Sequence, residues 1–139
     1  MSSLFLDAIM EVQELMRGLA GVRDASDLPK DKAAADLVIA CYPATGTWSG
    51  NTPEDILGLH NIEIAVHVPF KDVTRAIERT LPFGDLVPRT LFSAIRNGTF
   101  TTITTFGAIT YLYGGFPWND EPRFGWRFQV NDVKTVMSL

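Results

Sequence analysis

Hydrophobic and polar positions alternate strictly from Arg123 to Val130. Successive side chains of a strand point to opposite faces, so one face of this segment would be apolar and the other polar. The apolar face would carry Phe124, Trp126, Phe128 and Val130, and the other face Arg123, Gly125, Arg127 and Gln129. The pattern predicts a half-buried antiparallel strand. Segment 99–113 is rich in β-branched and aromatic residues, and we expect it to pair with this strand through an apolar, proline-containing turn at 114–122.

Helical periodicity is found before and between the predicted strands. Apolar residues recur every third or fourth position over 4–19, which predicts an amphipathic helix whose acidic side faces solvent. A second helix is expected over 71–81, ended by a proline. Asp85 is placed to cap a further helical piece that stops at 97–98, so that the two pieces form one broken helix. The polar segment 22–36 is expected to be irregular.

Two more strands are predicted in the first half of the chain. Residues 37–42 are a continuous apolar run of strand length, which Pro43 is expected to stop. Residues 59–68 alternate and form the next strand. Segment 45–58 between them is polar and glycine-rich, and we expect a long loop that is either a partner-binding arm or a floppy hairpin tip. Residues 131–139 are expected to be a short tail that can extend the last strand.

The order of elements predicts the fold class. Helix, strand, strand, helix, strand, strand fits an α+β two-layer sandwich, in which a four-stranded, mainly antiparallel sheet carries the helices on one face. A length of 139 residues suits a single domain over 1–139, with enough buried surface for a core.

Composition narrows the function classes. The net charge of −4 argues against a nucleic-acid-binding surface, which usually carries an excess of Lys and Arg. The single cysteine, Cys41, lies in an apolar run and is expected to be a small buried hydrophobic residue. No apolar run approaches the roughly 18 residues of a membrane span, and the start of the chain does not have the pattern of a signal peptide. We therefore expect a soluble protein made in the cytoplasm.

Candidate catalytic residues do not converge in the sequence. His60 and His67 would point to opposite faces of one strand, about 23 Å apart, so they could not share a metal ion within one subunit. Glu63 shares a face with His67 but lies about 13 Å from it, too far for proton transfer. The acidic pairs 54–55 and 120–121 fall in predicted loops without an apolar wall. We expect no enzyme activity, no metal and no cofactor.

Large aromatic residues remain where turns are usually polar. Phe116, Trp118 and Trp48 all fall in predicted turns or loops, where aromatic residues are typical of protein contacts. The alternative is a local mini-core beneath each loop. Arg123 and Arg127 share a strand face and could bind an anion, but such residues more commonly face water or pair with carboxylates of a neighbouring subunit.

Three segments carry a family resemblance, namely 59–69, the broken helix through 81–88, and 111–118 before the aromatic last strand. With the small size and the order of elements, they resemble the tail terminator, or tail completion, proteins of long-tailed bacteriophages. The resemblance implies a homo-oligomeric ring, usually hexameric, that caps the tail tube, stops tube polymerisation and presents a docking surface to the head–tail connector protein. It also implies assembly in the host cytoplasm and a place at the tail–neck junction of the virion.

That function would use surfaces instead of a catalytic set. The first hairpin would reach the tube or a neighbouring subunit, and the second hairpin would make a further contact. The candidate interface residues are Trp48, Asn51, Glu54, Asp55, Phe116, Trp118, Asp120, Arg123 and Arg127. The acidic balance suits a channel through which DNA passes without being specifically bound, because like charges repel.

Two alternatives remain open at this stage. A head-completion or neck adaptor protein of the same virion would form a ring of similar size. A small α+β enzyme or ligand-binding domain would instead use a pocket between sheet and helices, with His60 or His67 as its polar group.

Overall fold

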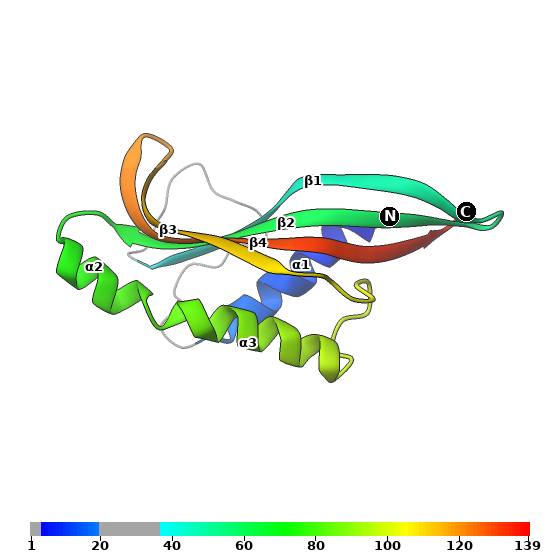
Figure 1. The fold of residues 1–139 in the computed structure, drawn as a ribbon, viewed down its shortest axis with the longest axis horizontal. Coiled ribbons are helices and arrows are strands. Elements are labelled where there is room, and N and C mark those ends of the chain that lie inside the picture. The colour runs from blue at the N-terminus through cyan, green and yellow to red at the C-terminus, as the bar shows by residue number, and fades with distance from the viewer. Residues whose placement is uncertain (1–3, 20–36) are drawn as a thin grey trace.

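The computed structural model describes residues 4–19 and 37–139 and combines one antiparallel sheet with three helices (Figure 1). The sheet has four strands in the order β1-β2-β4-β3. The elements are α1 (Leu4–Arg17), β1 (Val38–Thr52), β2 (Asp55–Pro69), α2 (Val73–Thr80), α3 (Phe83–Arg96), β3 (Ile109–Trp118) and β4 (Glu121–Ser138). The α+β class is confirmed, but the order of helices differs from the prediction, because two separate helices follow β2. The predicted irregular segment 22–36 lies outside the described residues.

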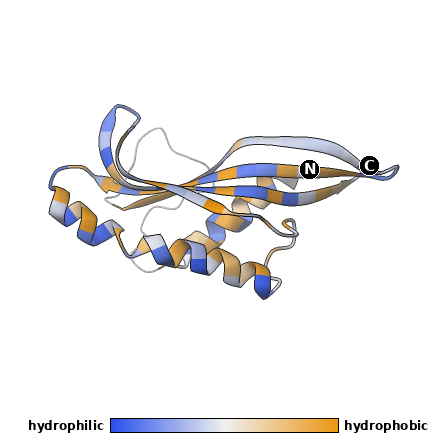
Figure 2. Cartoon of the chain, in the orientation of Figure 1, coloured by the Kyte–Doolittle hydropathy of each residue, from blue (hydrophilic) through white to orange (hydrophobic). Residues whose placement is uncertain are grey.

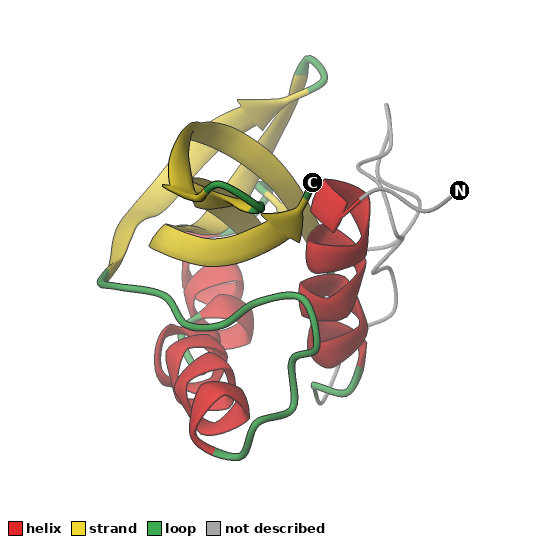
Figure 3. Cartoon of the chain, turned by 90° about the vertical axis from the view of Figure 1, so that its right-hand side faces the viewer, coloured by secondary structure: helices red, strands yellow, loops and turns green. Residues whose placement is uncertain are grey.

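The core lies between one face of the sheet and the apolar sides of the helices. The alternation predicted for β4 is confirmed, since Phe124, Trp126, Phe128 and Val130 are all buried and join one cluster with residues of β1, β2, α1 and α3. Figure 2 shows the matching alternation of hydrophobic and hydrophilic residues along the strands. Figure 3 shows the same sheet end-on, strongly curved beside the helices.

The first hairpin is much longer than predicted, and the expected loop at 45–58 is wrong. β1 continues through Pro43 to Thr52, and the register of β1 against β2 shifts between Pro43 and Thr45. β1 is an edge strand, so a proline without an N–H group can stand at an irregularity there without costing a ladder hydrogen bond. We call the paired segments 45–60 and 133–138 the arm, and in Figure 1 its right-hand end extends past the ends of all three helices.

The helices begin near the predicted positions, with one difference in the capping residue. The side chain of Asp72 accepts a hydrogen bond from the Arg75 backbone N–H at 3.3 Å and caps α2. α3 already begins at Phe83, so Asp85 lies in its first turn and is not its cap. The predicted stop is confirmed, because Gly98 adopts a left-handed φ of 65° directly after the last turn.

The second hairpin is shifted along the chain relative to the prediction. Segment 99–108 is irregular apart from a bridge between Thr105 and Lys134, and β3 begins only at Ile109. β3 then runs through the segment expected to be the turn and ends in a two-residue turn at 119–120, where both residues have positive φ, as a type I′ turn requires. The expectation that 131–139 extends the last strand is confirmed, since β4 continues to Ser138.

Candidate functional site

The tip of the second hairpin folds back over the sheet face that points away from the core. Phe116 and Trp118 are half-buried strand residues, with ring centroids 5.2 Å and 4.7 Å from that of His67. Gly114 and Gly125 are paired at the bend, and a Cβ atom on Gly125 would lie 2.0 Å from the Val66 carbonyl oxygen. The expectation that the two aromatic residues sit at an exposed tip is therefore wrong, and they form a local mini-core.

Arg123 is the most unexpected member of this mini-core. Its side chain is 2% exposed, its Nε–H donates to Nδ1 of His67 at 2.8 Å, and Nη2 lies 3.4 Å from the His67 carbonyl oxygen. A guanidinium group can only donate, so Nδ1 is the acceptor and the neutral His67 ring carries its proton on Nε2. The expectation that Arg123 faces water is therefore wrong, whereas its binding of an anion stays a prediction.

Arg127 belongs to a second, cross-strand network on the same face. Its Nε and Nη2 atoms both lie 2.9 Å from Oε1 of Glu63, whose other oxygen accepts a hydrogen bond from the Tyr42 hydroxyl. The Glu63 carboxylate raises the pKa of Arg127, while burial first and Glu63 second raise the pKa of Tyr42. Arg127 pairs with a carboxylate of its own chain, so the network ties β1, β2 and β4 together.

His60 lies in the arm, in a different environment from His67. Its Nε2 is 3.1 Å from Oγ1 of Thr135, and its ring meets that of Trp48 edge-on at a centroid distance of 4.7 Å. Gly58 makes room for the ring, because a Cβ atom there would lie 2.3 Å from Nε2. Burial lowers the pKa of His60. Trp48 covers one edge of His60 and remains 44% exposed.

The remaining candidate residues mark the two hairpin tips. Asn51 and Glu54 are exposed at the end of the arm, where the Thr52 hydroxyl accepts hydrogen bonds from the Glu54 and Asp55 N–H groups at 3.2 and 3.1 Å. Asp120 is exposed at the tip of the second hairpin. Figure 1 places these tips at opposite ends of the molecule, so one chain presents two separate surfaces and not one continuous patch.

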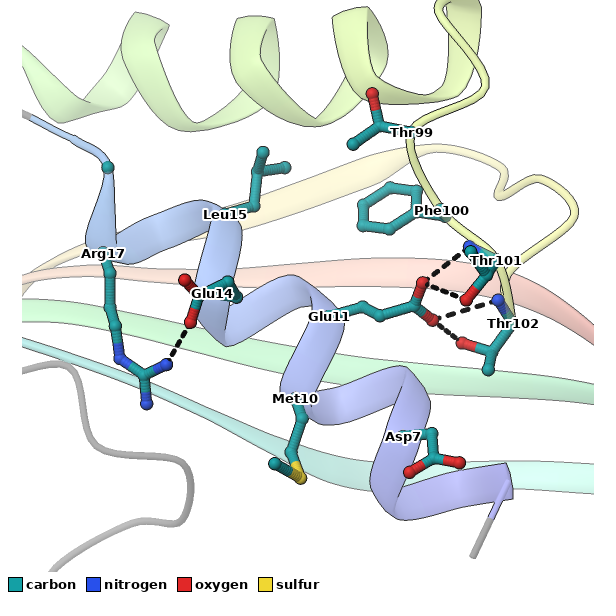
Figure 4. Close-up of a pocket in the computed structure, with 11 residues that line it drawn as sticks. Asp7, Met10, Glu11, Glu14, Leu15, Arg17, Thr99, Phe100, Thr101 and Thr102 are labelled. Carbon is teal, nitrogen blue, oxygen red and sulfur yellow. Dashed lines mark hydrogen bonds and ion pairs between the residues drawn. The ribbon is translucent and has the colours of Figure 1, made fainter. Parts of the chain in front are cut away.

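A groove between α1 and the irregular segment 99–108 was not anticipated (Figure 4). Both carboxylate oxygens of Glu11 accept hydrogen bonds from this segment, Oε1 from the Thr101 N–H and hydroxyl at 2.5 and 2.8 Å, Oε2 from the Thr102 N–H at 3.0 Å and its hydroxyl. The groove has a volume of about 860 Å³ and also contacts Met10, Glu14 and Phe100. The sequence pattern placed Glu11 on a solvated helix face. Its partners Thr101 and Thr102 are neighbours of each other but lie far from Glu11 in the sequence, so no local pattern indicated the contact.

Two further observations concern metal ligands and membrane-spanning helices in the described residues. Among residues 4–19 and 37–139, no three His, Cys, Asp or Glu side chains are arranged to hold a metal ion. No helix in these ranges is long and apolar enough to cross a membrane. Comparison with models of protein families gives no match, and comparison with curated proteins gives none either.

Proposed function

We propose that this protein is a virion structural protein, a tail terminator that forms a ring on the phage tail tube and offers a docking surface to the head–tail connector. The proposal combines the family resemblance with one observation, the arm. A chain that acts by assembly needs surface that its own core does not use, and the arm is such a surface.

The arm has far more exposed surface than its own fold requires. All of β1 from Pro43 to Thr52 is exposed, and on its neighbours Val136 is 39% exposed while Ile56 and Leu57 are half-buried. A thin sheet with apolar residues left in contact with water gains stability when a second surface covers it. Trp48 would supply the large aromatic contact that protein interfaces favour.

The helices and the folded-back hairpin leave distinct parts of the chain for different partners. In this proposal the helices cover one face of the sheet, and the arm reaches the neighbouring subunit or the tube. Asp120 at the second tip is exposed and available for another contact. Phe116 and Trp118 instead pack against His67 of the same chain and hold the hairpin on the sheet. Glu54 and Asp55 place negative charge at the end of the arm, which suits a ring through which DNA passes.

The first test of the proposal is the oligomeric state of the purified chain. Light scattering after size-exclusion chromatography, with native mass spectrometry, should give one defined ring-sized species, expected to be a hexamer. A chain that stays monomeric up to its solubility limit would overturn the proposal. Small-molecule binding in the groove beside Glu11, detected as thermal stabilisation of such a monomer, would favour the ligand-binding alternative.

The second test is the location of the protein in assembled particles. Gold-labelled antibody against the chain, applied to phage particles assembled with this gene, should label the tail end that meets the head. Separated tails should keep the label if the chain is a terminator. Label retained on heads alone would identify a neck adaptor instead.

A further inference from the structure

The two edge strands of the sheet carry no charged residue. Over their full lengths, β1 and β3 contain neither Asp, Glu, Lys nor Arg, whereas the central strands β2 and β4 contain seven such residues. Natural sheets usually show the opposite pattern, because charges on an edge strand prevent its unpaired N–H and C=O groups from joining another chain. In the described part of the chain, β1 pairs only with β2 and β3 only with β4.

Both edges are also long and accessible. β1 is exposed from Pro43 to Thr52, with its proline confined to the first position of this stretch. On β3, Tyr111 is 64% exposed and Leu112 is 68% exposed, and they lie ahead of the bend at Gly114. Each edge therefore offers a regular run of backbone groups suited to strand addition, residues 45–50 between the two register shifts of β1 and residues 109–113 ahead of the bend in β3.

We propose that β1 of one copy pairs with β3 of the next copy, so that the sheet continues from subunit to subunit around the ring. This inference rests on the proposed function and specifies its subunit contact. β1 and β3 lie at opposite edges of the same sheet. Pairing β1 of each copy with β3 of the next copy therefore relates all copies by one rotation axis, and no edge strand remains unpaired when the ring closes.

Side-chain size and net charge favour this pairing over pairing of like edges. β3 contributes the large exposed side chains of Tyr111 and Leu112, while β1 flanks Trp48 with Gly46, Thr47, Ser49 and Gly50, which leave room for large side chains on the opposing strand. Each copy carries a net charge of −4, so copies repel one another generally, and the uncharged edges are where close approach costs least. Like-edge pairing would give a two-fold dimer and leave the other edges open.

Cross-linking between introduced cysteines tests the pairing directly. Thr47→Cys on β1 and Thr110→Cys on β3 are exposed positions, and a short bis-maleimide reagent joins thiols without requiring one exact register. The native Cys41 is buried and its pKa is raised by that burial, so the unmodified chain serves as the control that should not react.

The expected result is a cross-linked dimer when the two single variants are mixed, and none when either variant is treated alone. The double variant should give a ladder of linked species that ends at the size of the ring. A dimer from Thr47→Cys alone would show that β1 pairs with β1 and overturn the inference, as would one from Thr110→Cys alone. An oligomer without any cross-link would overturn it while leaving the proposed ring intact, whereas a monomer by light scattering would refute the proposed function.

A charge placed on the edge gives an independent measurement. Leu112→Lys should raise the dissociation constant of the oligomer by about tenfold or more, because the ammonium group would lose water at the new strand pair. Ser93→Lys, at an exposed position of α3, adds the same charge away from both edges and should assemble normally. Circular dichroism checks that both variants are folded, and equal assembly by the two variants would contradict the inference.

Discussion

Gly125 is the position where an added methyl group should be most damaging. A Cβ atom there would lie 2.0 Å from the Val66 carbonyl oxygen and 2.8 Å from Cα of His67, and both are backbone atoms of the neighbouring strand β2. Ordinary contact begins at 3.4 Å, so β2 and β4, the two central strands of the sheet, would have to separate there by more than an ångström. Overpacking typically costs about 1–3 kcal/mol, and lost ladder hydrogen bonds add to it.

We therefore expect Gly125→Ala to lower the free energy of unfolding by about 3 kcal/mol or more, and the melting temperature by roughly 10 °C. Gly18→Ala is the matched control, because the nearest atom to its Cβ position is the Leu15 carbonyl oxygen at 3.5 Å, an ordinary contact, and its φ is not in the left-handed region. That variant should stay within about 0.5 kcal/mol of the unmodified chain.

Urea unfolding followed by circular dichroism, at one fixed protein concentration, measures both changes by linear extrapolation. A Gly125→Ala variant as stable as Gly18→Ala would refute the close approach of β2 and β4. A change in the urea dependence itself would instead indicate an altered unfolded state.

Three further predictions concern other parts of the chain. Burial lowers the pKa of His60 below 6.5. As the pH falls through 6.5, the unfolded chain therefore gains a proton on this residue while the folded chain does not. The free energy of unfolding is retained above that pH and declines below it. His60→Gln should make the decline between about pH 7 and pH 5 shallower in urea titrations, and an unchanged slope would contradict this. Glu11→Gln should speed amide hydrogen exchange at Thr101 and Thr102 by about tenfold, since one oxygen that accepts from this segment becomes a donor; unchanged exchange would count against the Glu11 contact. Cys41 should not react with a thiol reagent until the protein unfolds, because the thiol is buried and its pKa is raised, and fast labelling of the folded chain would disprove its burial.

The regular parts of the fold follow from local patterns. Alternation of apolar residues in β4 and the four-residue spacing in α1 gave the correct elements because each has one buried face and one less buried face. The end of α3 followed from a glycine in a left-handed conformation. These signals lie within a few neighbouring residues, so the sequence contains them directly.

The errors arise where distant segments decide the structure. Pro43 does not stop β1 because that strand lies at the sheet edge, a property of strand order and not of the local sequence. Segment 99–108 has the composition of a strand, but its threonines bond to Glu11, more than eighty residues earlier. Arg123 was expected to face water, but it is buried where the second hairpin bends. That bend depends on Gly114 and Gly125, which pair across β3 and β4 and are distant in the sequence.

The sequence identified unusual aromatic residues on both hairpins, but it did not predict which side chains they contact. Trp48 does lie on an exposed hairpin, as expected, although on a strand and against His60. Phe116 and Trp118 were identified as unusual for a turn, and that signal is equally consistent with a partner surface and with a mini-core. Only the curvature of β3 distinguishes the two, and curvature cannot be read from hydrophobic periodicity.

The pairing of the last strand with the first hairpin has a practical consequence for labelling. Ser138 pairs with Asp55, and the Leu139 N–H donates to the Glu54 carbonyl oxygen at 2.7 Å, so a fluorophore or affinity tag attached after residue 139 would emerge beside the end of the arm (Figure 1). A small dye there would report directly on whatever approaches this end, while a bulky fusion would obstruct it. Purification handles for assembly studies should therefore be removable.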